Sequence, residues 1–192
     1  LAALLLSLCL LMGTASARDA FSVEDLCVDD WMVGTPQDVL RETFGAPEGE
    51  NVEEKNGISY TTLTYDGIEL TYTEEGLCGA RWTNDTVAGP RGLHVGDEEA
   101  SVRKAFRDDG LDGDVLYTSG TVGDFGRQLP PCGVIESDET GERTYYYLAP
   151  LAAYDADMRP EDFVSRTHAM LWLRMESEHV AEIRWAVGLP SE

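Results

Sequence analysis

The strongest constraint on the fold is an eleven-residue pattern that occurs twice. Residues 34–44 and 96–106 both begin with Gly, continue through turn or capping residues and end in Phe. Each copy carries two apolar side chains four positions apart, which are Leu40 and Phe44 in the first copy and Val102 and Phe106 in the second. Residues four apart lie on the same helical face, so each copy predicts a short amphipathic helix.

A second repeated pattern follows each predicted helix. The tripeptide Ala80-Arg81-Trp82 recurs as Ile183-Arg184-Trp185, each time at the end of a predicted hairpin. In the first hairpin, Asp66-Gly67 is a strong two-residue turn signal, and it gathers the apolar residues on one face. The pairs that it predicts are Tyr65 with Ile68, Leu63 with Leu70 and Thr61 with Tyr72.

The next predicted turn, at 74–76, pairs Leu70 with Ala80 and Ile68 with Trp82, and it places Cys78 on the core face. In the second hairpin a three-residue loop at 176–178 would pair Ala169 with Trp185. Both registers bury the repeated Trp on the same side of the strands.

These patterns predict an α+β fold made of two tandem repeats, each a helix followed by an antiparallel β-meander. We place the first repeat at 18–90 and the second at 91–192. The second is longer, and its Gly, Pro and Asp content predicts a long loop insertion near 119–160.

The repeat resembles a known group. Residues 34–40, leading to Phe44-Gly45-Ala46-Pro47 and then to Ala80-Arg81-Trp82, look like the unit of the β-lactamase-inhibitory-protein-like (BLIP-like) fold. The outer-membrane assembly lipoproteins of the SmpA/OmlA type share that unit. Residues 91–97 resemble the entry to a second copy in tandem, exported bacterial forms. The resemblance implies an extracytoplasmic interaction module whose sheet faces a protein partner, and it transfers no inhibitory contact residue.

The charge distribution excludes several classes of partner. The chain has 36 acidic residues against 14 basic ones, for a net charge of -22. Such a surface repels phosphate backbones and anionic lipids, so we expect no nucleic-acid binding and no peripheral membrane binding.

None of that charge lies in residues 1–17, an apolar stretch that ends in Ala15-Ser16-Ala17. Its length and small-residue end are typical of a secretory signal peptide and too short for a stable membrane span. We therefore expect a secreted or cell-envelope protein.

Three cysteines follow the predicted signal, and they leave two alternatives open. Cys27, Cys78 and Cys132 could contribute one disulfide and one further thiol, as is common in exported chains. They could equally be three reduced, packed side chains.

No catalytic motif stands out in the chain. The histidines His94, His168 and His179 are too dispersed for a dyad in the predicted register, and no nucleophile, zinc or nucleotide motif is present. We predict a non-enzymatic protein that uses no cofactor.

The best metal candidate is the acidic loop that contains Asp108, Asp112 and Asp114. Its carboxylates could bind Ca²⁺ through oxygen, but the loop lacks the ligand spacing of an EF-hand. A solvated turn that uses Gly110 and Gly113 is the preferred interpretation, and the sequence predicts no metal site.

Aromatic and basic residues on the predicted outer face are the candidates for partner binding, because Trp, Tyr and Arg are enriched at binding hot spots. The opposing interpretation is that the inserted segment or the other repeat covers Trp172. The candidates are Met170, Trp172, Arg174, Arg184, Tyr146 and Tyr60.

The sequence therefore predicts an exported, non-enzymatic module that binds a macromolecular partner, expected to be a protein, through its sheet face or inserted loop. Two alternatives remain. One is a carbohydrate-active or other hydrolytic module that uses surface carboxylates. The other is a cell-envelope assembly or structural factor.

Overall fold

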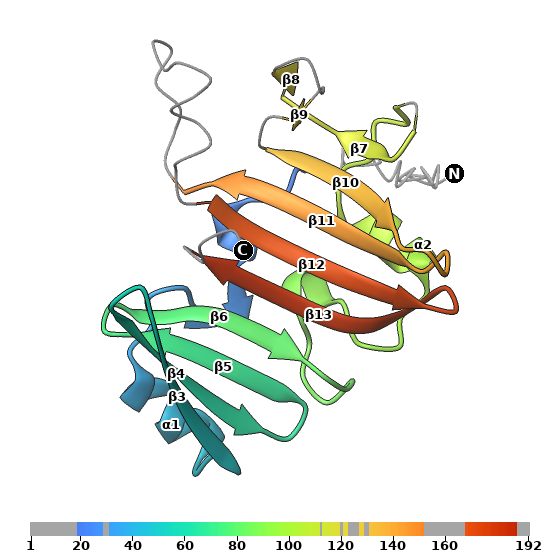
Figure 1. The fold of residues 1–192 in the computed structure, drawn as a ribbon. Helices are drawn as coiled ribbons and strands as arrows, with labels where there is room; N and C mark the ends of the chain where they lie inside the picture. The colour runs from blue at the N-terminus through green and yellow to red at the C-terminus, as the bar shows by residue number, and fades with distance from the viewer. Residues whose placement is uncertain are drawn as a thin grey trace, which may run out of the picture.

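An antiparallel sheet of nine strands organises the described part of the chain (Figure 1). The computed structural model describes residues 19–28, 31–111, 113–119, 121–122, 127–128, 131–151 and 168–187. From edge to edge the strands are β3 (Gly49–Lys55), β4 (Ile58–Tyr65), β5 (Ile68–Thr73), β6 (Gly76–Trp82), β13 (His179–Val187), β12 (His168–Glu176), β11 (Arg143–Pro150), β10 (Cys132–Ser137) and β7 (Val115–Tyr117).

Short elements complete the described part. The helices are α1 (Gln37–Phe44) and α2 (Glu99–Ala105), with 3-10 turns η1 (Val23–Asp25) and η2 (Pro90–Gly92). Two small strand pairs are β1 (Cys27–Val28) with β2 (Trp31–Met32), and β8 (Thr121–Val122) with β9 (Arg127–Gln128). Within the described residues, no helix has the length and apolar character needed to cross a membrane.

The predicted fold class is wrong. The described residues do not form two helix-plus-meander units, but a mostly β structure in which one sheet runs through both halves. The two halves form one sheet because β6 pairs with β13. Without this pairing, each of these two strands would leave a row of unpaired backbone groups at the edge of its own sheet. The predicted insertion is also not simply a loop, since β10 and β11 lie within 119–160 and belong to the same sheet.

Both helices pack on the same face of the sheet, as Figure 1 shows, and the core lies between them and the strands. Leu40 of α1 and Val102 of α2 are fully buried, as the apolar spacing predicted. The prediction that both repeated Trp side chains face the core is confirmed. Trp82 and Trp185 are fully buried, and their indole N–H groups donate to the carbonyl oxygens of Ala88 (3.2 Å) and Cys27 (3.4 Å).

The register predicted for the first hairpin is confirmed, with Tyr65 opposite Ile68 and Leu63 opposite Leu70. The pairing of Ile68 with Trp82 is also confirmed. The core position predicted for Cys78 is wrong. A bulge in the β5–β6 pairing puts Leu77 in the core and turns Cys78 to the other face of the sheet.

The register predicted for the second hairpin is wrong by two residues. Trp185 pairs with Leu171 rather than with Ala169. Two features cause the shift. The turn has only two residues, Ser177 (φ 51°) and Glu178 (φ 66°), both with positive φ as in type I′ hairpins, and the pairing shifts by one more residue at the irregularity between Arg174 and Met175. A shift of two residues preserves the faces, so the Trp remains in the core.

The side chain of Arg91 connects residues 19–25 with η2 and α2 through hydrogen bonds. Its guanidinium binds Asp25 through two bonds (2.7 and 2.8 Å) and donates to the carbonyl oxygens of Asp19, Ala20 and Ala105 (2.7 to 2.9 Å). It also lies 4.5 Å from the ring centre of Phe106. Five hydrogen bonds from one side chain therefore connect residues 19–25 with η2 and α2.

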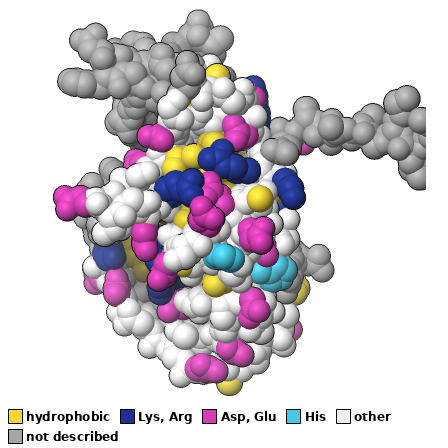
Figure 2. Space-filling model, turned by 90° about the vertical axis from the view of Figure 1, so that its right-hand side faces the viewer, with side chains coloured by type: hydrophobic (Ala, Val, Ile, Leu, Met, Phe, Trp, Pro, Cys, Tyr) yellow, Lys and Arg dark blue, Asp and Glu magenta, His cyan; other side chains and the backbone are white. Residues whose placement is uncertain are grey.

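Glu99 ties α2 to the sheet. Its side chain is 11% exposed and accepts hydrogen bonds from Arg103 (3.1 Å), Arg143 (2.9 Å) and the hydroxyl of Tyr145. On the side of the molecule that carries α2, basic and acidic side chains are interleaved around a small apolar patch (Figure 2). The basic side chains there stand among acidic ones and do not form a basic patch.

Candidate functional site

The candidate site is a row of side chains on the outer face, by which we mean the face of the sheet that turns away from α1 and α2. The register aligns one residue from each of five adjacent strands, β11, β12, β13, β6 and β5. We call them the aromatic–arginine row, and in strand order they are Tyr146, Trp172, Arg184, Arg81 and Glu69.

The alternation of side chains along each strand explains this placement. Tyr145 and Tyr147 are buried in the core, so Tyr146 between them lies on the outer face, as the sequence predicted. Trp172 lies in the same way between Leu171 and Leu173. Both aromatic residues are half-buried, and burial raises the pKa of the Tyr146 phenol above its usual value.

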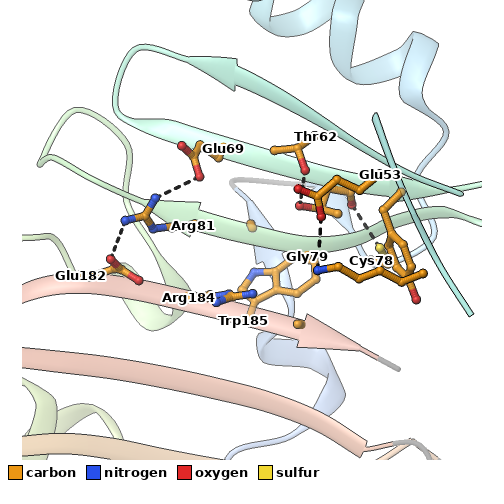
Figure 3. A pocket seen from close by; sticks show the side chains of 14 residues that line it. Glu53, Thr62, Glu69, Cys78, Gly79, Arg81, Glu182, Arg184 and Trp185 are labelled. Carbon is orange, nitrogen blue, oxygen red and sulfur yellow. Dashed lines mark hydrogen bonds and ion pairs between the residues drawn. The ribbon is translucent and has the colours of Figure 1, made fainter. Parts of the chain in front are cut away.

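Arg81 is held by two carboxylates. Its guanidinium contacts Glu182 at 2.8 Å and Glu69 at 3.2 Å, as the dashed lines in Figure 3 show. These contacts, led by the hydrogen bond with Glu182, raise the pKa of Arg81 further above its already high value. Arg81 is therefore a fixed and neutralised cation.

Arg184, which pairs directly with Arg81 across β6 and β13, has a different environment. Its guanidinium carbon lies 5.3 Å from the centre of the Trp172 ring. Of the arginines whose side chains the structure describes, only Arg184 has no carboxylate within ion-pair distance. It is thus an exposed cation on an aromatic support in a strongly acidic chain.

A hollow of about 360 Å³ lies beside this row, and Gly79, which Figure 3 labels, is among the residues that line it. Ala186 also lines the hollow. The small size of these two residues, which are paired neighbours on β6 and β13, leaves the space open. Cys78 lines the hollow and donates to the carbonyl oxygen of Thr71 (3.4 Å). Burial raises the pKa of this thiol to about 11, so it is a poor nucleophile at neutral pH.

The charged side chains of the hollow balance one another. Its three carboxylates are Glu53, Glu69 and Glu182, and its three cations are Lys55, Arg81 and Arg184. Lys55 pairs with Glu53 at 3.2 Å, and Arg81 takes the other two carboxylates. The unpaired charge of the hollow is therefore that of Arg184.

The remaining predicted binding residues lie on the same face but outside the row. Tyr60 on β4 is 8% exposed and lines both this hollow and a more apolar one that includes Ile58, Leu151 and Val187. Met170 lies in the adjacent row, where it pairs with Ala186, and is half-buried.

Arg174 is exposed at the far end of β12 and lies 3.7 Å from Glu176. The structure thus groups Tyr146, Trp172 and Arg184 and leaves Arg174 at the margin of this group. Of the inserted segment near 119–160 that was considered as a cover for Trp172, residues 120, 123–126, 129–130 and 152–160 lie outside the described residues.

The acidic loop is tied to its neighbours by its own side chains. Asp108 accepts from Arg103 (3.0 Å) and from the amide of Gly110 (3.0 Å), and Asp114 is exposed. Asp112 lies outside the described residues. In the part of the chain that the structure describes, no three His, Cys, Asp or Glu side chains are grouped for a metal ion.

The three cysteines predicted to form one disulfide or none are all thiols in the structure. Cys132 is buried, and burial raises the pKa of its thiol to about 11. The structure joins no two of these three cysteines, and the choice between the two alternatives stays a prediction.

The histidines lie apart from the row. His179 is exposed beside the β12–β13 turn, where a ring nitrogen is 2.9 Å from the carbonyl oxygen of Ser177, and His168 is at the other end of this hairpin. His94 precedes α2 and is half-buried.

Sequence reasoning missed four residues of the site, which are Gly79, Arg81, Glu69 and Glu182. Glu69 meets Arg81 through the pairing of β5 with β6, whereas Glu182 reaches this group only because β6 pairs with β13, and it is 101 residues from the arginine that it binds. The repeated tripeptides were the available signal, since their central residues are Arg81 and Arg184.

No protein-family model matches the chain, and no curated protein matches it. Among solved structures it is similar to an extracellular protein containing an SCP domain from Bacillus anthracis (11% identity, TM-score 0.41, 87% of this chain and 46% of that one). A cysteine-rich secretory protein from Staphylococcus aureus (13%, 0.39, 80% and 44%) and the uncharacterized protein yfeY from Escherichia coli (10%, 0.35, 86% and 97%) are also similar.

The chain spans less than half the length of the first two of these structures. At these identities and TM-scores the likenesses carry no argument about function. The resemblance to the BLIP-like group stays a prediction, and the function is argued below from the outer face alone.

Proposed function

We propose that the chain is an exported, non-enzymatic module that binds a protein partner through the outer face of its sheet. The single observation that carries the proposal is the row in which Tyr146, Trp172 and Arg184 stand side by side on three adjacent strands. These three residue types dominate binding hot spots, and a cluster of them on a surface is typical of an interaction site.

The row is suited to recognition because its side chains are fixed before any partner binds. Trp172 and Tyr146 project from strands that have hydrogen-bonded neighbours on both sides, and Arg184 lies against the indole. Ordering a side chain at an interface costs about 0.5–1.5 kcal/mol, so groups that are already ordered lose less on binding.

The export part of the proposal depends on residues 1–17, whose apolar character and Ala15-Ser16-Ala17 ending are typical of a signal peptide. It can be tested by N-terminal sequencing of the protein recovered from the producing cells. Cleavage after Ala17 supports export, and a mature protein that retains residues 1–17 contradicts it.

The test of partner binding uses the immobilised full chain to capture proteins from secreted and envelope fractions. The captured proteins are compared for the wild type, Tyr146→Ala and Trp172→Ala. Loss of one hot-spot side chain of about 2 kcal/mol weakens binding about 30-fold. We therefore expect a partner that the wild type retains and both variants lose.

Val52→Ala is the matched control. Val52 is 60% exposed and pairs with Thr61 on the opposite face of the sheet, so its loss also removes exposed apolar surface. A partner captured equally by the wild type and the two row variants, or lost equally with Val52→Ala, would contradict the proposed binding face.

A further inference from the structure

The central strand pair has a local twofold arrangement about the paired residues Arg81 and Arg184. On one side, β5 presents Glu69 opposite Arg81, and on the other side β12 presents Trp172 opposite Arg184. Diagonally across the pair, Glu182 lies two residues before Arg184 and binds Arg81. The equivalent position, two residues before Arg81, is Gly79.

Both carboxylates that hold Arg81 therefore have uncharged counterparts beside Arg184. Trp172 takes the position that corresponds to Glu69, and Gly79 takes the position that corresponds to Glu182. The Trp supports the flat side of the guanidinium, and a planar guanidinium stacked in this way still has N–H donors along its edges. Those donors fit a carboxylate, which can accept two of them at once.

The space for such a carboxylate lies over Gly79. This residue lines the hollow and has no side chain to fill it. A Cβ atom built there would lie 3.4 Å from the carbonyl oxygen of Trp185 and 3.5 Å from Cβ of Thr71, which is ordinary contact. Gly79 does not have a positive φ, so its backbone conformation would also accommodate a residue with a side chain. The local backbone therefore does not require glycine at this position.

We propose that the space over Gly79 receives an Asp or Glu side chain of the protein partner, whose carboxylate binds Arg184 as the carboxylate of Glu182 binds Arg81. The inference rests on the proposed function, because it names the chemical group that the partner brings to the same face. The chain carries a net charge of -22, yet an acidic group complements the surface at Arg184. The reason is that Glu182 binds Arg81, and no described carboxylate binds Arg184.

The test uses the Nε–Hε NMR signals of the arginines in the full chain. The probe is N-acetylglutamate N-methylamide, and the control probe is its glutamine analogue, both at constant ionic strength. We expect the Arg184 signal to shift with the glutamate probe, with a dissociation constant on the order of 10 mM. The glutamine analogue should leave it in place, and the signal of the already neutralised Arg81 should move little with either probe.

Two substitutions at Gly79 sharpen the result. Gly79→Glu supplies the carboxylate from the chain itself, so the Arg184 signal should start in a shifted position and the probe should move it at least tenfold less. Gly79→Ala adds the Cβ without the charge and should still respond to the probe. Lys104→Gln removes a cation on α2 that has no carboxylate of the described residues within ion-pair distance, and it should respond as the wild type does.

If Gly79→Glu fails to fold, Arg184→Gln replaces it. The indole N–H signal of Trp172, which moves with the glutamate probe in the wild type, should then become insensitive to it. Equal shifts with the two probes, an unmoved Arg184 signal, or an unchanged titration in Gly79→Glu or Arg184→Gln would overturn the inference. None of these outcomes would affect capture of a protein partner through Trp172 and Tyr146, so failure here is distinct from failure of the proposed function.

Discussion

Replacing Arg91 with alanine removes the side chain that holds residues 19–25 against the rest of the protein. The substitution breaks two bonds to Asp25 and three to the carbonyl oxygens of Asp19, Ala20 and Ala105. The side chains of Arg91 and Asp25 are only 21% and 11% exposed, so water replaces these bonds poorly. The contact between the guanidinium and the Phe106 ring is lost as well.

We expect this substitution to lower the free energy of unfolding by about 3–4 kcal/mol. Removing one partner of a fully buried ion pair costs about 3–5 kcal/mol because the other charge stays buried, and the residual exposure here reduces that cost. For a chain of this size, 1 kcal/mol corresponds to about 2–4 °C in Tm, so the Tm should fall by roughly 6–16 °C.

The backbone provides an internal check. Arg91 has φ of 56°, a left-handed conformation that strains a residue with a side chain. Arg91→Gly loses the same contacts but relieves this strain, so it should be about 1 kcal/mol less destabilised than Arg91→Ala.

The assay is urea unfolding followed by tryptophan fluorescence, with Arg107→Ala as the control. Arg107 also binds a carboxylate through two 2.7 Å bonds, but that partner, Asp109, is two residues away and both side chains are well exposed. Such a pair contributes about 0–1 kcal/mol. If Arg91→Ala and Arg107→Ala differ by less than 1 kcal/mol, the reasoning that Arg91 fastens the N-terminal segment is refuted.

Three further predictions concern stability. Glu99→Gln should lower the free energy of unfolding by about 2–3 kcal/mol in urea, because two arginines lose a buried carboxylate; a change below 0.5 kcal/mol would contradict this. Gly76→Ala should destabilise more than 2 kcal/mol by the same assay, since its Cβ would lie 2.3 Å from the carbonyl oxygen of Gly34 at a φ of 109°; a Tm equal to that of the wild type would disprove the clash. Burial raises the thiol pKa values of Cys78 and Cys132 to about 11 from 9.0, so the folded state favours the neutral thiols. The stability that this gives is fully present below pH 9 and should be lost as the pH rises from 9 through 11. A flat profile of unfolding free energy across that range would contradict the burial of both thiols.

Local patterns predicted the local structure well. The Asp66-Gly67 turn gave the register of β4 with β5, and the spacing of Leu40 and Val102 gave the buried faces of the two helices. Alternation along the strands was enough to bury both repeated Trp residues, even where the turn was one residue shorter than expected. Errors arose at bulges, because one extra residue reverses the face of its neighbours, as it does for Cys78.

The arrangement of the sheet could not be predicted in the same way. The pairing of Arg81 with Arg184 joins residues that are far apart in sequence, and no turn or spacing specifies it. The predicted binding residues Tyr146, Trp172 and Arg184 lie in one row because of backbone register, whereas the hollow beside them depends on a glycine that no sequence pattern marked. Side-chain type was therefore informative about where binding residues lie, but not about the space next to them.

The charged edge strand has a consequence for how the protein behaves at high concentration. β3 is seven residues long and lies at one edge of the sheet, where no described strand pairs with its outer side. A strand of this kind can template the addition of another chain. Its exposed side chains Glu50, Glu53, Glu54 and Lys55 would bring like charges together in any copy that added in register, and the opposite edge, β7, has only three residues. The nine-stranded sheet can therefore remain open at both ends without growing into a fibril.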